Sequence, residues 1–96
     1  MAIFLVMLHH SGPEWDAARA IEDQSNWTAH AGFMDDLVDA GFVILGGPLD
    51  DYRVVLAVET ESAEIVRATL GRDPWFESHL RIDHIDPWSV RLDSRR

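Results

Sequence analysis

The segment His30–Leu49 reads HAGFMDDLVDAGFVILGGPL, and it joins the end of an amphipathic helix to a buried strand. At about 100° per residue, the apolar side chains from Trp27 onward fall on one arc and the acidic ones fall opposite. Gly41 is typical of the residue that follows a helix end, and Phe42–Leu45 is an apolar run typical of a buried strand. The apolar arc comprises Trp27, Ala31, Met34, Leu37, Val38 and Gly41.

The chain before this segment predicts a strand and another helix. Ile3–Leu8 is continuously apolar, which suits a strand covered on both faces. Glu14–Gln24 is helix-like, with acidic residues in the first turn, where the helix dipole favours them. Its apolar side does not line up with the arc of the next helix. We therefore expect a break between the two, with Ser25 or Asn26 as the new N-cap.

The chain after the segment predicts a hairpin, a helix and a final strand. Tyr52–Glu59 is close enough to Phe42–Leu45 to pair with it as a hairpin. A helix begins at Thr60 or Ser62 and ends at Gly71. The last strand alternates in polarity and is bent or broken near Pro87. Its apolar parity comprises Leu80, Ile82, His84, Trp88, Val90 and Leu92.

The order β-α-β-β-α-β is the ferredoxin-like arrangement, an α+β fold with an antiparallel sheet. Helices cover one face of such a sheet and leave the other face open. Here the open face should be apolar, because Ile3–Leu8 and Val54–Val58 have apolar residues on both phases. A large exposed apolar face needs a partner. We therefore expect a homodimer that pairs face to face as a dimeric α/β barrel.

Length and charge restrict the protein class. The 96 residues suit a single domain, 1–96, of which 93–96 resemble a loose tail. The net charge of −9, from 8 basic and 17 acidic residues, disfavours nucleic acid and anionic membranes as partners. The absence of cysteine excludes disulfides and thiolate chemistry. Met1–Leu8 has neither the length of a membrane span nor the features of a secretory signal, so we expect a cytoplasmic protein.

His30 and Asp73 are the leading candidates for chemistry. His30 lies within the apolar arc, so its side chain should point towards the sheet, either as a hydrogen-bonded core histidine or as a general acid/base. Asp73 follows a helix end and precedes a proline, as a turn aspartate often does. Across a cleft from His30, it would instead orient the imidazole and stabilise its charged form.

Several other residues are candidates for ligand contact. Gly46-Gly47-Pro48 is a strand-end bulge or turn, or else a place where a ligand approaches the backbone. Trp75 is a core residue or the wall of a pocket for a planar ligand. His84 shares the apolar parity of the last strand and should line the same interior, whereas His79 falls on the opposite parity. The adjacent His9 and His10 point to opposite faces of a strand. With no closely spaced ligand pair, the five histidines do not predict a metal site.

These residues together resemble the YCII-related (YciI-like) family over nearly the whole chain. The matching features are the helical His30, the run Gly41–Leu49, Asp73-Pro74-Trp75 and Pro87-Trp88. The resemblance implies a ferredoxin-like dimeric α/β barrel with a His–Asp pair in a cleft, here His30 and Asp73. A related activity is dehydrochlorination of a chlorinated hydroxyhydroquinone, which implies acid/base elimination without a cofactor. Where arginine often precedes the histidine, this chain has Gln24–Trp27 instead.

We therefore expect a cofactor-independent, lyase- or isomerase-like enzyme acting on a small cyclic or aromatic metabolite. His30 would move the proton, Asp73 would orient it, and the backbone at Gly46-Gly47 would lie against the ligand. The alternative is a non-catalytic domain for ligand binding or assembly, since one fold hosts unrelated functions. A third class is a haem- or oxygen-dependent monooxygenase. It is disfavoured because this chain has no clear second cluster of ligands beyond His84.

Overall fold

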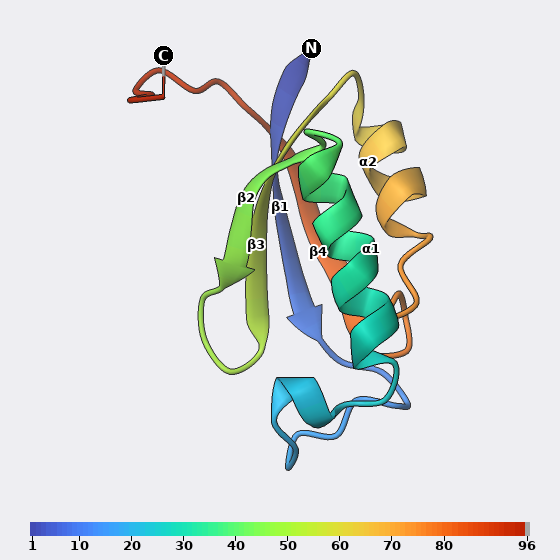
Figure 1. Ribbon diagram of the computed structural model, residues 1–96. Helices are drawn as coiled ribbons and strands as arrows, with labels where there is room; N and C mark the ends of the chain where they lie inside the picture. Colours follow the sequence, from blue (N-terminus) through green and yellow to red (C-terminus); the bar gives the residue numbers. More distant parts are fainter. Residues whose placement is uncertain (96) are drawn as a thin grey trace.

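The computed structural model describes residues 1–95 as a four-stranded sheet with two α-helices and one short 3-10 helix (Figure 1). Arg96, the last residue of the predicted tail, lies outside the described residues. The elements in chain order are β1 (Ala2–His10), η1 (Ile21–Asp23), α1 (Trp27–Asp39), β2 (Val43–Pro48), β3 (Arg53–Thr60), α2 (Ala63–Leu70) and β4 (Leu80–Trp88).

The strand order is β2-β3-β1-β4, and every neighbouring pair is antiparallel. Both α-helices lie on the same side of this sheet (Figure 1). The predicted β-α-β-β-α-β order and α+β class are confirmed, and the topology is compatible with a ferredoxin-like fold.

Alternation along β1 separates the two faces of the sheet. Phe4, Val6 and Leu8 are buried against the helices, and the odd-numbered residues between them are only half-buried. From α2, Val66 and Leu70 pack into the same core. The hydrophobic core therefore occupies the space between the sheet and the helices.

Both ends of α1 have left-handed residues that redirect the chain. Asn26 precedes the helix at φ 60°, so the predicted N-cap position is confirmed, although its side chain makes no capping hydrogen bond. Gly41 has φ 78°, and its N–H donates to the Val38 carbonyl while the Phe42 N–H donates to Leu37. This pair of bonds is a Schellman motif, and it confirms Gly41 as the helix stop.

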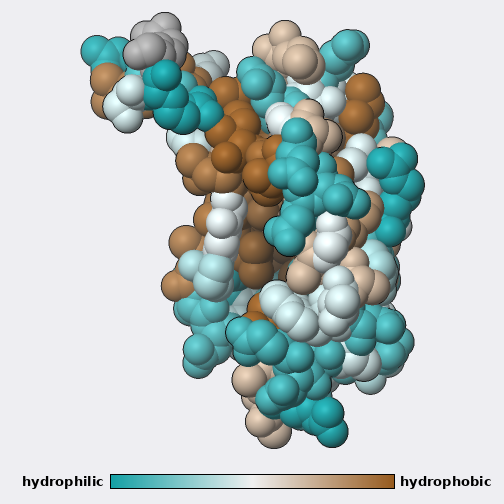
Figure 2. Space-filling model, viewed as in Figure 1, coloured by the Kyte–Doolittle hydropathy of each residue, from teal (hydrophilic) through white to brown (hydrophobic). Residues whose placement is uncertain are grey.

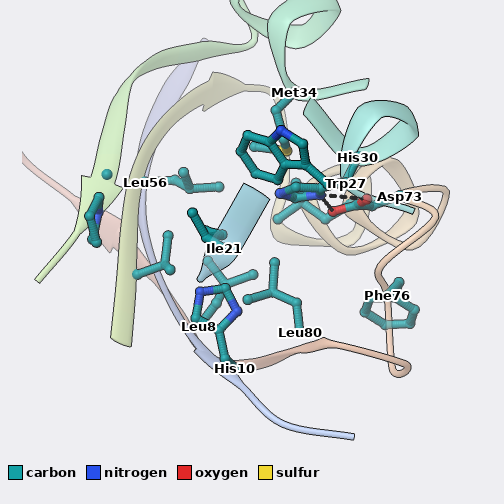
Figure 3. A pocket seen from close by; sticks show the side chains of 14 residues that line it. Leu8, His10, Ile21, Trp27, His30, Met34, Leu56, Asp73, Phe76 and Leu80 are labelled. Atoms are coloured by element: carbon teal, nitrogen blue, oxygen red, sulfur yellow. Dashed lines mark hydrogen bonds and ion pairs between the residues drawn. The ribbon is translucent and has the colours of Figure 1, made fainter. Parts of the chain in front are cut away.

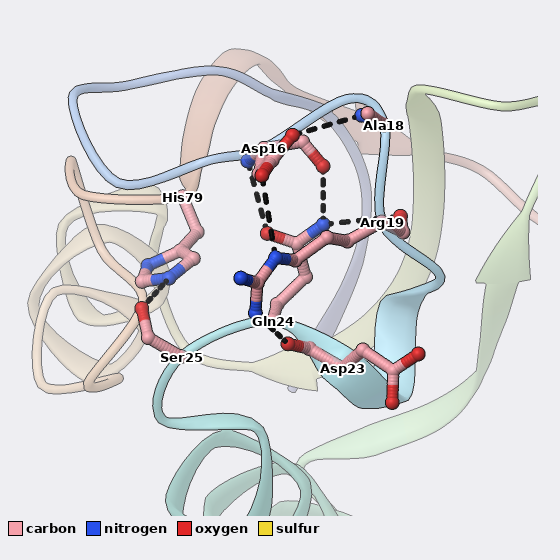
Figure 4. Close-up of polar contacts among 7 residues, drawn as sticks. All are labelled: Asp16, Ala18, Arg19, Asp23, Gln24, Ser25 and His79. Atoms are coloured by element: carbon pink, nitrogen blue, oxygen red, sulfur yellow. Dashed lines mark hydrogen bonds and ion pairs between the residues drawn. The ribbon is translucent and has the colours of Figure 1, made fainter.

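The predicted helix over Glu14–Gln24 is wrong. The segment consists of turns followed by η1, and the side chain of Gln24 closes it into a loop (Figure 4). The Gln24 amide accepts the Asp16 N–H at 3.0 Å and donates to the Asp16 and Arg19 carbonyls. An Asp16 carboxylate oxygen also accepts the Ala18 N–H. Such side-chain bonds to the backbone compete with a helix, which explains the difference.

The predicted parity of the last strand is wrong beyond Ile82. Met7 pairs with His84 but Leu8 pairs with Ile82, so Asp83 is an extra residue in β4. A bulge of this kind reverses which side chains face the core. Consequently Ile85 packs against the core, whereas His84 is exposed on the open face. The strand ends at Trp88, before the expected end at Leu92.

Apolar surface remains on both faces of the sheet. On the side of the helices, Figure 2 shows a strip of apolar residues between β2 and α1. On the open face, Leu45 and Trp88 are 61% and 46% exposed. Among residues 1–95, none of the helices combines the length and apolar character that crossing a membrane requires.

Two glycines should respond oppositely to alanine. Gly12 has φ 128°, and a Cβ there would lie 2.5 Å from the carbonyl oxygen of Ser78. Gly32 lies within α1 with nothing near its Cβ position. We expect Gly12→Ala to lower the free energy of unfolding by about 1–3 kcal/mol, and Gly32→Ala to raise it by about 0.5–1 kcal/mol. Urea unfolding measures both, and equal effects would contradict the predicted backbone strain at Gly12.

Candidate functional site

A cavity of about 150 Å³ lies between the sheet and the helices, where α1 begins and α2 ends (Figure 3). Its floor comes from apolar residues of β1 and β3, and loop residues on both sides close it. Its ionisable side chains are His10, His30 and Asp73. The other lining residues are Leu8, Ile21, Trp27, Met34, Gly47, Pro48, Val54, Leu56, Leu70, Phe76 and Leu80.

His30 and Asp73 make direct contact at the wall of this cavity. Nδ1 of His30 lies 2.8 Å from each carboxylate oxygen of Asp73, and the two residues are only 8% and 7% exposed. An ionised carboxylate can only accept, so the Nδ1–H of His30 is the donor. Nε2 is then the basic nitrogen of the ring, free to take a proton from a ligand. The structure thus brings together the two residues predicted to pair.

Local hydrogen bonds hold Asp73 in place after α2. Its carboxylate accepts the Trp75 N–H at 2.9 Å, and its own N–H donates to the Leu70 carbonyl at 3.1 Å. Its carbonyl accepts the Phe76 N–H at 2.9 Å. A side chain that bonds to the backbone two residues on forms an Asx turn, which the intervening Pro74 rigidifies. The carboxylate is therefore positioned before any ligand arrives.

Trp75 forms a support behind His30. The indole is fully buried, and it stacks on His30 with ring centroids 4.0 Å apart and planes 4° apart. His79 also stacks on it, at 4.8 Å and 10°. The indole N–H donates to the Ser25 carbonyl at 2.8 Å, just before α1 begins. Trp75 does not line the cavity, so its contact with a ligand would be indirect.

His79 is fully buried and links three segments of the chain. Its Nε2 lies 2.9 Å from the Ser25 hydroxyl (Figure 4), and its Nδ1 lies 2.7 Å from the Ser78 hydroxyl. Ser25 in turn donates to Glu14 at 3.3 Å. Burial is the largest influence on the His79 pKa and lowers it, although the Glu14 carboxylate acts in the opposite direction. This histidine has the partners of a structural residue.

His10 is a cavity residue that the sequence reasoning missed. It ends β1, is 8% exposed, and stacks on Trp15 with centroids 4.1 Å apart. Its Nδ1 is buried and has no hydrogen-bond partner within residues 1–95. Burial lowers the pKa of His10, with the His79 carbonyl opposing and His30 adding to the effect. The sequence does contain an indication of this position. Every second residue of a strand faces the same side, and His10 continues the series Phe4, Val6 and Leu8.

The other predicted ligand contacts divide between three places. Gly47 and Pro48 line the cavity. Gly46 lines the adjoining groove between β2 and α1, and a Cβ there would collide with the Leu56 side chain. His84 lies on the open face, outside the cavity, because the bulge in β4 reverses its direction.

Comparisons with protein-family models, curated proteins and solved structures find no match. The described residues contain no cluster of three or more His, Asp or Glu side chains that could hold a metal ion. What the site can do therefore follows from its own side chains: one imidazole–carboxylate pair and one unpaired imidazole in an apolar cavity.

The depressed His10 pKa predicts a loss of stability in mild acid. The ordinary pKa of histidine is 6.5. Below that pH the unfolded chain takes up a proton that folded His10 does not, so the free energy of unfolding decreases as the pH is lowered. The contribution is fully present above pH 6.5. We expect His10→Phe to show a smaller decrease between pH 7 and pH 5 than the wild type. Urea unfolding at the two pH values measures this.

The control is Val6→Ala, which weakens the same strand without removing a titratable group. It should keep the wild-type decrease. A decrease of the same size in His10→Phe would show that His10 does not contribute to the acid sensitivity.

Proposed function

We propose that the protein is a small cofactor-independent acid/base enzyme that moves a proton on a cyclic or aromatic metabolite. The observation that carries this is the buried 2.8 Å contact between His30 and Asp73 at the wall of an apolar cavity. The YciI-like pattern of motifs supports the same pairing, and it favours a lyase- or isomerase-like reaction related to dehydrochlorination.

The pair supplies the groups that proton transfer needs. Asp73 holds the His30 Nδ1–H, so Nε2 takes the proton when a substrate C–H bond breaks. In an elimination, the electron pair of that bond forms a C=C bond while the leaving group departs with its own pair. In an isomerisation, Nε2 returns the proton to another carbon. In both cases the Asp73 carboxylate balances the transient imidazolium charge.

The setting of His30 also supports proton transfer. An imidazolium stacked on an indole is attracted to the negative face of the ring, and here the centroids are 4.0 Å apart. The stack and the hydrogen bonds hold the imidazole in one orientation. Such pre-organisation lowers the barrier to a reaction whose geometry is demanding.

The cavity size favours a single ring as substrate. An apolar cavity of about 150 Å³ in another protein admits benzene, and this cavity has about the same volume. Its apolar floor would bind a ring by burial, with few polar groups to fix the orientation. A two-ring compound would need the adjoining groove between β2 and α1 as well.

The alternative function is a non-catalytic domain that binds the same kind of ligand. The predominantly apolar lining favours it, because burial alone binds a ring without any proton transfer. In that case the His30–Asp73 pair only gives the ligand a polar contact.

We also propose that two copies pair through their open sheet faces. Leu5, Met7 and Val55 present half-buried apolar side chains there, and Trp88 is 46% exposed beside them. Burying such a face removes apolar surface from water, which drives association. The face-to-face dimeric barrel of the YciI-like resemblance has this geometry.

Hydrogen–deuterium exchange tests the catalytic proposal. Cyclohexanone is a single ring whose α-protons exchange with solvent through base-catalysed enolisation. We expect the protein to accelerate this exchange in D2O, followed by proton NMR. His30→Asn should abolish the acceleration, and Asp73→Asn should reduce it by about 100-fold or more, because the imidazole is then no longer held in the productive tautomer.

His84→Asn is the matched control, because it removes an exposed imidazole outside the cavity. It should leave the exchange rate unchanged. Binding of cyclohexanone in the cavity with no acceleration of exchange would favour the non-catalytic alternative.

The pairing proposal predicts a dimer that a charge on the open face dissociates. We expect Val55→Asp to lower the mass in solution from two chains to one, because an unpaired carboxylate is costly to bury in an interface. Light scattering after size-exclusion chromatography measures this. Val38→Asp, at an exposed position on α1, should leave the mass unchanged. A wild-type mass of one chain would contradict the proposal.

A further inference from the structure

His10 is a second imidazole in the candidate cavity, separate from the His30–Asp73 pair. Figure 3 shows its ring at one end of the cavity and the pair at another, with Leu8, Ile21 and Leu80 between them. The proposed proton transfer uses only His30 and Asp73. The role of His10 is therefore open.

The His10 ring has an unmet hydrogen-bonding capacity. Its Nδ1 is buried without a partner within residues 1–95. The His79 carbonyl acts to raise the His10 pKa and accepts the Ser11 N–H at 3.0 Å, but it makes no hydrogen bond of standard length and angle to Nδ1 of His10. A buried polar atom without a partner costs free energy, so native structures rarely keep one without a reason. His10 lines the cavity, so a ligand oxygen there would supply a hydrogen-bond partner to its imidazole.

The ring is also fixed in orientation. It stacks on Trp15 with planes 8° apart, and it meets the edge of Trp75 at a centroid distance of 5.9 Å. Burial lowers the pKa of His10, which favours the neutral ring. A neutral imidazole has one donor and one acceptor, so it can bind either a hydroxyl or a carbonyl.

We propose that His10 binds an oxygen substituent of the ligand and that the site takes an oxygenated single ring, such as a phenol or a cyclic ketone. The oxygen lies at the His10 end of the cavity, while a ring carbon lies against Nε2 of His30. His10 thereby selects the ligand and sets which carbon reacts. This rests on the cavity being the ligand site; the binding of the oxygen by His10 does not depend on catalysis, whereas the choice of the reacting carbon does.

The surroundings of His10 suit such a substituent. His10, Ile21 and Pro48 also line a neighbouring hollow formed by the 15–21 loop and the turn at Asp50-Asp51. An oxygen at this end is therefore close to the polar loop, whereas the ring stays against the apolar floor.

Benzene and phenol are the probes for the experiment, because they share the ring and differ by one oxygen. Their affinities for the wild-type protein are measured by NMR titration. We expect phenol to bind more tightly than benzene, and we expect His10→Phe to reduce this preference by about three- to tenfold. Phenylalanine keeps the stack on Trp15 and removes both ring nitrogens. His84→Phe, which removes the same two ring nitrogens at an exposed position outside the cavity, should keep the preference.

A direct measurement on the wild type does not depend on the folding of any variant. Long-range proton–nitrogen spectra resolve the ring nitrogens of each histidine. Phenol should move the nitrogen shifts of His10 more than benzene does, because only phenol can form the hydrogen bond. No difference between the two probes at His10 would overturn the inference.

The outcomes separate this inference from the proposed function. If both probes bind and His10→Phe keeps the phenol preference, the role of His10 is overturned and the cavity remains a ligand site. If the preference is lost in His30→Phe alone, the oxygen binds at the other end and the inference is again overturned. If neither probe binds, both proposals are overturned. A phenol preference that needs His10, without cyclohexanone exchange, supports the inference and contradicts only catalysis.

Discussion

The buried Asp73 carboxylate is the constraint on which the rest of the site depends. Removing a carboxylate from water is costly unless hydrogen bonds compensate for the lost hydration. Here the compensation comes from the His30 ring and the Trp75 N–H, which fix the end of α2 against the first turn of α1. The bond from the His30 ring also sets the tautomer of His30. The packing of the two helices and the candidate chemistry therefore both require the hydrogen bond between His30 and Asp73, and a change to this bond alters both.

Trp75 extends that constraint to the rest of the chain. His30 and His79 stack on its indole, His10 meets its edge, and its N–H reaches the backbone before α1. Aromatic contacts of this kind restrict both distance and angle. The three imidazoles consequently have different environments although they surround one side chain. His30 faces a carboxylate, His79 lies between two hydroxyls, and His10 has a buried nitrogen without a partner.

The sequence predicts those parts of the fold that depend on local periodicity, and it fails where single side chains or single residues intervene. The helix arc from Trp27 and the stop at Gly41 follow from a 3.6-residue repeat. The loop at 14–24 does not, because Asp16 and Gln24 bond to its backbone in place of a helix. The predicted direction of His84 is wrong because one extra residue in β4 changes the phase of alternation. The pairing of His30 with Asp73, 43 residues away, is predicted only when the helical periodicity around His30 is combined with the family resemblance.

The loop closed by Gln24 separates two kinds of residue around the cavity. His30 and Asp73 belong to helix and helix-end backbone, whereas Ile21 is part of a surface loop that the Gln24 amide holds in shape. Surface loops diverge more readily than the elements they connect. In evolutionary terms, descendants of this chain can exchange the wall at Ile21 and accept new ligands while their proton-transfer pair stays in place. Diversification of this scaffold should therefore concentrate in the segment between β1 and α1.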